Sequence, residues 1–335
     1  MVTNQAYNFL KTCLGILWLL DATLQLQPLM FTKLFPEEVV LPAFESLPFK
    51  AFFIGTLYPL ILSHVFVFNL FVFCVQALLG FLVIVYHKSA LTLSCAWSFL
   101  VWVFGEGFGG IFVTPPSVLL GFPGAALLYF WLSFILIFWE RCPQLRCFAG
   151  IFLLAFSFLQ FDTVMFTQNF QSAVFSGDAL PKELVPSIEF VKVFASSYPV
   201  LMNLLEILLN FISSLIIKKR GFVVVISYLV FVWYFAQNLG GILTGIGTDP
   251  NSAPLIALLS YASYKSERVF ELRTAGLKCL PMLRLCLHFL NILRVLEFQF
   301  SHDVAHFPVE VLAIKGVEEN LTLIGIALIY HSNFC

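Results

Sequence analysis

Four polar residues interrupt apolar stretches of the chain and are its first candidates for chemistry. Asp21 and Gln25 lie four residues apart in WLLDATLQLQ, so they share one face if this segment is a helix. Glu106 lies within VWVFGEGFGG, and Gln237 holds the matching position in VWYFAQNLGG. A carboxylate in apolar surroundings is costly unless it pairs, takes up a proton or faces water. We therefore expect these four residues to line a small polar pocket that handles a proton, a cation or a polar headgroup.

Structural roles compete with this interpretation. Glu106 near a helix end also fits an interfacial carboxylate that reaches the outer headgroups. Asp21 and Gln25 also fit polar groups that hydrogen-bond neighbouring helices, since Gln160 recurs where the second half matches Gln25. The sequence leaves both interpretations open.

Two glycine pairs follow these motifs, Gly109-Gly110 and Gly240-Gly241. Glycines at such positions let helices approach closely and let the chain turn with positive φ, so a packing and turn role is expected. The alternative is that the close-packed ends leave an outward-facing cavity. A dinucleotide loop is excluded, because no strand pattern precedes these glycines.

No other residues form a recognisable catalytic or metal motif. The 8 cysteines lack CxxC pairs, and the chain has no HExxH string, Walker loop or Ser-His-Asp order. We therefore predict no metal site, and the sequence names neither a catalytic residue nor a cofactor. Whether the protein is an enzyme stays open.

The composition indicates where these residues must act. Apolar residues make up 60% of the 335 positions and charged residues 11%, against about 25% in soluble domains. The mean hydropathy is +0.94. Such a chain cannot cover a soluble globule with polar surface, so we predict an integral membrane protein whose partner is the lipid bilayer. The net charge of −1 gives no reason to expect a nucleic-acid partner.

The apolar runs predict an all-α protein with eight spanning helices. Their approximate bounds are 9–26, 61–86, 90–108, 121–139, 147–160, 198–217, 221–238 and 253–264. One side of this arrangement holds 11 Lys and Arg and the other holds 4. Because short loops rich in Lys and Arg stay cytoplasmic, both termini are predicted inside, and the loops 27–60 and 161–197 outside.

The two halves of the chain repeat several motifs in the same order. The triplet MFT at 30–32 recurs at 165–167, and Asn69-Leu70 recurs as Asn203-Leu204. VWVFGEGFGGI aligns with VWYFAQNLGGI at an offset of 131 residues, which also carries Pro123 onto Pro254. These matches predict an internal duplication.

The duplication divides the chain into three parts. We predict a first four-helix membrane repeat at 9–140, a second at 147–264, and a cytoplasmic or interfacial tail at 265–335. Because four spans is an even number, both repeats begin on the same side of the membrane. They should therefore be parallel and related by an axis along the membrane normal.

The strings WLLDATLQLQPLMFT, VWVFGEGFGGIF, GFPGAALLY and NLGGILTGIGTDPNSAPLIALL resemble a family of bacterial multispanning membrane proteins with Gly-Gly and Pro-Leu-Leu signatures. Each four-span unit also looks, in architecture only, like the DoxX-type membrane bundle. These resemblances imply a bacterial cytoplasmic membrane and a redox subunit associated with quinone or with a membrane protein partner. The alternatives are a small-solute or proton-coupled transporter and a structural or assembly protein.

Overall fold

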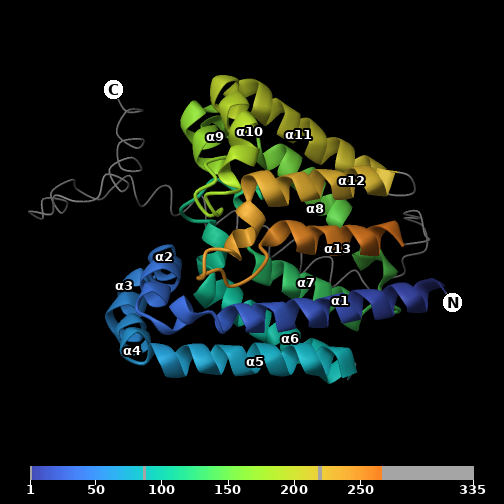
Figure 1. The fold of residues 1–335 in the computed structure, drawn as a ribbon. Coiled ribbons are helices and arrows are strands. Elements are labelled where there is room, and N and C mark those ends of the chain that lie inside the picture. Colours follow the sequence, from blue (N-terminus) through green and yellow to red (C-terminus); the bar gives the residue numbers. More distant parts are fainter. Residues whose placement is uncertain (1, 86–87, 218–220, 266–335) are drawn as a thin grey trace, which may run out of the picture. The chain divides into compact units, whose positions relative to one another are not determined.

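The computed structural model describes residues 2–85, 88–217 and 221–265. Over these ranges the backbone is helical and contains no β-strand, which confirms the all-α prediction for this part of the chain (Figure 1). The predicted tail 265–335 lies outside the described residues, apart from Lys265.

Each predicted span overlaps a helix of the structure. The helices of the first half are α1 (Val2–Gln25), α5 (Val65–Val85), α6 (Lys88–Leu100) continued by η4 (Val101–Gly105), and α7 (Ala125–Ile137). Those of the second half are α8 (Phe148–Leu159), α11 (Pro199–Ile216), α12 (Gly221–Phe231) continued by η9 (Val232–Ala236), and α13 (Ser252–Tyr264).

Three helices of the described chain are long and apolar enough to cross a membrane: Val65–Val85, Lys88–Gly105 and Pro199–Ile216. Shorter apolar helices occupy other predicted spans, among them α7 and α13 with 13 residues each. At a rise of about 1.5 Å per residue, such a helix covers about 20 Å of a hydrocarbon core about 30 Å thick. The number of eight spanning helices therefore stays a prediction.

The segments 27–60 and 161–197, predicted as loops, are largely helical. The first contains η1 (Pro28–Phe31), η2 (Pro36–Val40), α2 (Leu41–Glu45), α3 (Lys50–Phe52), η3 (Phe53–Leu57) and the start of α4 (Tyr58–Ser63). The second contains η8 (Thr163–Phe166), α9 (Gln168–Val174) and α10 (Val185–Ser197). Prolines interrupt the apolar pattern here, but they stand in the first turn of several of these helices, where no backbone N–H is needed. Proline thus begins helices that the sequence analysis took for loops.

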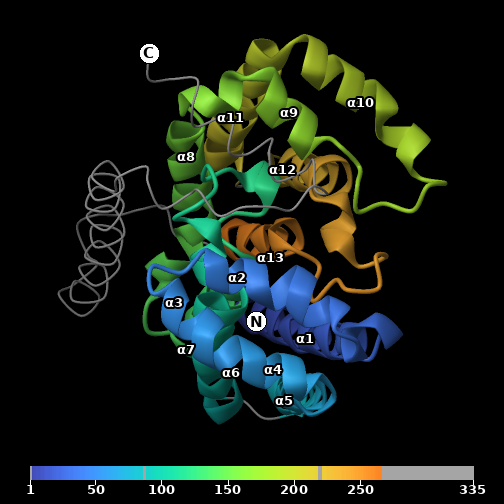
Figure 2. The same cartoon turned by 90° about the vertical axis from the view of Figure 1, so that its left-hand side faces the viewer.

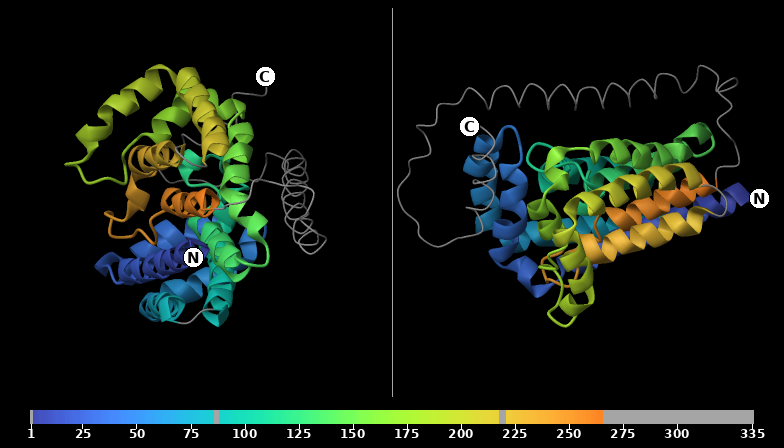
Figure 3. Two further views of the ribbon diagram at one scale, coloured as in Figure 1. Left: turned by 90° about the vertical axis from the view of Figure 1, so that its right-hand side faces the viewer. Right: turned by 90° about the horizontal axis from the view of Figure 1, so that it is seen from above.

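The long helices pack in pairs, α1 on α5, α6 on α7, α8 on α11 and α12 on α13. Gly15 and Gly80 let α1 and α5 approach closely: a Cβ on Gly80 would lie 2.8 Å from the carbonyl oxygen of Gly15. α13 also contacts α1, α7 and α8, so it lies in the interior of the bundle (Figure 2). Figure 3 shows that α1 begins and α13 ends on the same side.

Two helices end in the same unusual way. After a π-helical turn, η4 leads into the 3₁₀ segment η5 (Gly107–Gly110), and η9 leads into η10 (Asn238–Gly241). In each segment a non-glycine residue takes a left-handed conformation, with φ of 59° at Phe108 and 57° at Leu239. Left-handed backbone costs about 1–2 kcal/mol for such residues, so the surrounding packing must hold these turns in place.

Matching hydrogen bonds brace the two halves. Trp102 Nε1 donates to the carbonyl oxygen of Pro123, and Trp233 Nε1 donates to that of Pro250, both at 2.8 Å. The counterpart of Pro123 in this bond is therefore Pro250, not Pro254 as the sequence alignment places it. The chain between the glycine pair and this proline is four residues shorter in the second half, so the offset falls from 131 to 127 residues there.

A second matched pair joins the start of each half to its next long helix. Asn69 Nδ2 donates to the carbonyl oxygen of Gln25 at 2.6 Å, and Asn203 Nδ2 donates to that of Gln160 at 3.0 Å. Both asparagines are fully buried. A buried amide that bonds the end of a neighbouring helix fixes how far the two helices can slide past each other.

Candidate functional site

Glu106 caps the helix that follows it. Its side chain lies just beyond η4, where Oε1 accepts a hydrogen bond of 2.9 Å from the backbone N–H of Ala126 in the first turn of α7. The partial positive charge of a helix N-terminus favours a carboxylate there. Oε2 is buried and has no hydrogen-bond partner among the described residues. Gly124 makes room for it, since a Cβ on Gly124 would lie 2.1 Å from Oε2.

Gln237 does the same work in the second half with a neutral group. Its Oε1 accepts from the backbone N–H of Ala253 at 3.1 Å, in the first turn of α13. Its Nε2 donates to the hydroxyl of Ser252 and to the carbonyl oxygen of Val118, both at 2.8 Å. The amide is therefore fully engaged in holding α13 to the first half and offers no free group to a ligand.

Asp21 and Gln25 lie on one face of α1 and are each 2% exposed. Asp21 Oδ1 and Gln25 Oε1 are buried, and neither accepts a hydrogen bond from any described residue. Tyr129 on α7 interacts with the Asp21 carboxyl group, yet its buried hydroxyl forms no hydrogen bond of normal geometry within the described chain. Burial without a partner costs about 1–3 kcal/mol for each such group, so these atoms point to an additional binding partner.

A third carboxyl group enters from the second half. Asp249 follows the glycine-rich segment 240–247, and its oxygens accept from the Thr248 hydroxyl at 2.8 Å and from the Asn251 backbone N–H at 2.7 Å. It acts electrostatically on both Asp21 and Glu106. Burial raises the pKa of the Asp249 carboxyl group above its usual value, although the bonds from Thr248 and Asn251 oppose the rise.

Further contacts hold the second half against the end of α1. Gln27 Nε2 donates to the carbonyl oxygen of Ile242 at 3.3 Å, while Gln27 Oε1 is buried without a partner in the described part. Gly245 lies so close to Leu29 that a Cβ would be 2.9 Å from Leu29 Cδ1. The structure thus brings Asp21, Gln25 and Glu106 to the junction of the two halves, and leaves Gln237 as a structural cap.

The sequence analysis did not assign Tyr129 or Asp249 to the site. Tyr129 lies in the apolar run ALLYFWL, and Asp249 stands before Pro250-Asn251, a pattern typical of a turn. Asp249 does form that turn, as its bond to Asn251 shows. Only its distance in space to Asp21 and Glu106 gives it a second role, and the local pattern carries no signal for that.

The four predicted turn glycines all have positive φ: 65° at Gly109, 74° at Gly110, 73° at Gly240 and 65° at Gly241. Gly109 and Gly240 also lie against backbone, since a Cβ would be 1.9 Å from the Pro123 oxygen and 2.5 Å from the Pro250 carbonyl carbon, respectively. Gly110 meets the Thr114 side chain, and Gly241 has open space around it. Turn geometry thus constrains all four, and close approach constrains two.

The site is rich in acceptors. Its unpartnered atoms are Asp21 Oδ1, Gln25 Oε1, Gln27 Oε1, Glu106 Oε2 and the Tyr129 hydroxyl. The described residues contain no group of three or more His, Cys, Asp or Glu side chains placed to hold a metal ion. The arrangement can therefore bind a hydrogen-bond donor or a proton.

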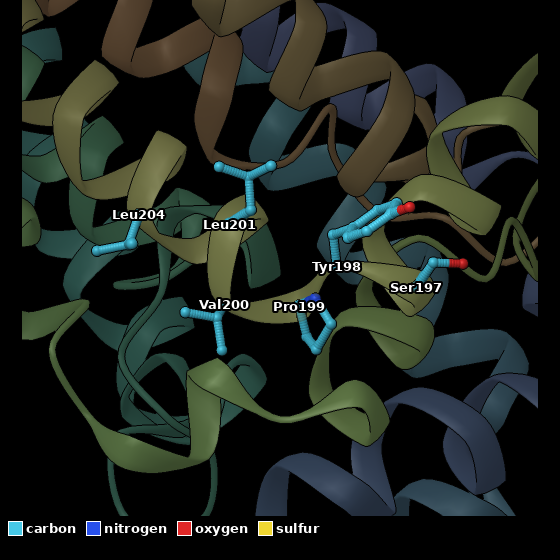
Figure 4. A pocket seen from close by; sticks show the side chains of 6 residues that line it. All are labelled: Ser197, Tyr198, Pro199, Val200, Leu201 and Leu204. Carbon is cyan, nitrogen blue, oxygen red and sulfur yellow. The ribbon is translucent and has the colours of Figure 1, made fainter.

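A separate hollow of about 390 Å³ lies where α10 meets α11, lined by Ser197, Tyr198, Pro199, Val200, Leu201 and Leu204 (Figure 4). The aliphatic side chains of this lining are exposed, like those along α11. None of the candidate site residues lines it. Its apolar surface suits contact with lipid chains rather than polar chemistry.

Comparison with protein-family models, with curated proteins and with solved structures gives no match. The resemblance to DoxX-type bundles therefore stays a prediction, and the argument for function rests on the site itself.

Proposed function

We propose that the chain is a multi-pass membrane protein built from two parallel four-helix repeats, 9–140 and 147–264, with both termini in the cytoplasm. Equal lengths of α7 and α13, paired π-helical turns and matched hydrogen bonds support the repeats. The excess of Lys and Arg on one side supports the orientation. The bacterial cytoplasmic membrane is part of this proposal through the family resemblance.

We further propose that the protein binds a small lipid-soluble ligand at the junction of the repeats, between Asp21, Gln25 and Glu106. The observation that carries this proposal is the set of buried acceptor oxygens without donors. A ligand that brings N–H or O–H donors, such as an amine or a hydroxylated lipid, would satisfy them. Gly124 leaves the space in which Glu106 Oε2 can meet it.

A quinone, suggested by the DoxX resemblance, has the opposite chemistry. Its carbonyl oxygens accept hydrogen bonds and donate none. It would bind here only when carboxyl groups of the site carry protons and the Tyr129 hydroxyl donates. The number of acceptors therefore favours a donor-rich ligand over a quinone.

A transporter is the second candidate, and one observation favours it. The site draws groups from both halves, since Asp21 and Glu106 belong to the first half and Asp249 to the second. Parallel-repeat transporters place their substrate at such an interface, where movement of one repeat against the other exposes it to either side. A structural or assembly role, the third hypothesis, leaves the unpartnered acceptors unexplained.

Mass spectrometry of small molecules retained by the purified protein tests the binding proposal. We expect a donor-bearing molecule to copurify with the wild type, to be lost from Asp21→Asn and to be kept by Asp178→Asn, an exposed carboxylate elsewhere in the chain. Thermal unfolding of each variant checks its fold. Retention of the same molecule by folded Asp21→Asn would refute the site, and ligand-dependent flux in proteoliposomes would favour the transporter.

A further inference from the structure

A second buried polar cluster lies in the second half, away from the junction. Glu206 and Asn210 are one turn apart on α11, and Tyr228 faces them from α12. Their exposed fractions are 2%, 0% and 5%, respectively. Glu206 stands near the middle of Pro199–Ile216, one of the helices long enough to cross a membrane. A carboxyl group at that depth is costly and usually functional.

The hydrogen bonds of this cluster need one more hydrogen than an ionised Glu206 supplies. The Tyr228 hydroxyl lies 2.5 Å from Glu206 Oε1 and 2.9 Å from Asn210 Oδ1. Both of these oxygens are acceptors when Glu206 is ionised, and a phenol has a single hydrogen to donate. One of the two contacts would then join two oxygens with no hydrogen between them.

A proton on Glu206 completes the chain of bonds. The acid O–H donates to the Tyr228 oxygen, and the Tyr228 hydroxyl then donates to Asn210 Oδ1. The 2.5 Å separation from Glu206 Oε1 to the Tyr228 oxygen suits a short O–H···O bond. Turning over the Asn210 amide would also supply a donor, but its oxygen would then lie 3.4 Å from the Glu206 carboxylate, where the two repel.

The surroundings offer no charge that would stabilise an ionised Glu206. The elements packed against α11 are α8, α9, α10, α12 and η8. Of these, α8, α9, α12 and η8 carry no charged side chain, and α10 carries Glu189 and Lys192. Neither of these two acts electrostatically on Glu206; the titratable group that faces it within the described chain is Tyr228.

We propose that Glu206, Asn210 and Tyr228 form a proton-binding site inside the membrane, in which the proton on Glu206 joins α11 to α12. The site is separate from the junction pocket and does not depend on the function proposed there. Release of the proton to solvent leaves a carboxylate that retains the Tyr228 hydrogen, so Asn210 loses its bond and the contact between the helices weakens.

The equivalent positions of the first half hold no acid. Given the offsets of 134 and 131 residues, Glu206, Asn210 and Tyr228 correspond to Val72, Gln76 and Trp97. Gln76 Oε1 and Trp97 Nε1 are buried and have no partner among the described residues. The proton site is therefore present once per chain, in the second half.

Infrared spectroscopy of the full-length protein in lipid vesicles at neutral pH tests this proposal. We expect a carboxylic acid C=O band that shifts in deuterium oxide, that is absent from Glu206→Gln, and that remains in Glu189→Gln, an exposed matched control. A spectrum of Glu206→Gln unchanged in this region would mean that Glu206 is ionised and would overturn the proposal.

A second variant decides the matter if Glu206→Gln does not fold. Tyr228→Phe keeps the acid but removes the oxygen that accepts from it, so the C=O band should move to the position of a more weakly bonded acid. An unmoved band in Tyr228→Phe would equally overturn the proposal, because the acid O–H would then not be bonded to Tyr228.

Discussion

Replacing Gly109 with alanine should destabilise the protein far more than the same change at Gly241. The two glycines have the same φ of 65°, so alanine pays an equal backbone cost, about 1–2 kcal/mol, at either position. The space around them differs. A Cβ on Gly109 would lie 1.9 Å from the Pro123 oxygen, whereas the nearest atom to a Cβ on Gly241, Thr244 Cγ2, is 3.8 Å away.

The clash at Gly109 has no flexible side chain to relieve it. Because a carbon and a carbonyl oxygen approach to about 3.3 Å at closest, backbone must move by about 1 Å or more. Such overpacking costs about 1–3 kcal/mol. The Pro123 oxygen also accepts from Trp102 Nε1 at 2.8 Å, and loss of that bond adds about 1 kcal/mol. We therefore expect Gly109→Ala to be about 2–4 kcal/mol less stable than Gly241→Ala.

Denaturation by sodium dodecyl sulfate, followed by far-ultraviolet circular dichroism, would give both free energies of unfolding. The two variants differ from the wild type by one methyl group, and each alters a turn of the same geometry. If their free energies of unfolding agree within about 1 kcal/mol, the close approach at Gly109 is not a constraint, and the reasoning from Cβ distances fails.

Three further changes test the site and the topology. Glu106→Gln keeps an oxygen for the N-terminus of α7, so unfolding should stay within about 1 kcal/mol of wild type while retention of the copurified ligand falls; full retention would exclude Glu106 from the site. Because the pKa of Asp249 is raised in the folded state, its contribution to stability should be complete below the ordinary Asp pKa of about 3.9 and should be lost as pH rises through the raised value. The fall in melting temperature over that window should be smaller in Asp249→Asn than in Asp178→Asn, and equal slopes would contradict the burial argument. Cysteines introduced at the exposed positions Glu45 and Glu183 should react with a membrane-impermeant reagent from the outside, and labelling from the cytoplasmic side alone would invert the topology.

Apolar runs and motif spacing predicted much of the architecture. Helices occur where the runs are, because an apolar segment of this length must satisfy its backbone internally. The glycine pairs were predicted as turns, and their positive φ angles confirm it. The proline-rich segment 27–60 was not predicted as helical, since a proline at the first turn of a helix and a proline that breaks one look alike in a sequence.

Distant contacts explain what the sequence could not supply. The pairing of Glu106 with Gln237 followed from the alignment, but the different use of the two side chains depends on what lies beside them, Gly124 and Val118 respectively. Asp249 is a turn residue locally and a site residue only through folding. The shift in offset near Pro250 was hidden because Pro254 offers an equally good match in letters.

The π-helical turns before Glu106 and Gln237 each hold one residue more than an α-helical turn of the same pitch would need. Removing one codon from Val101–Gly105 would let the backbone close into a regular α-helix and would rotate everything after it by about 100°. Glu106 would then point away from the N-terminus of α7. Single-letter changes within this stretch of the gene are therefore expected to be far better tolerated than the loss of one triplet, although the loss leaves the reading frame intact.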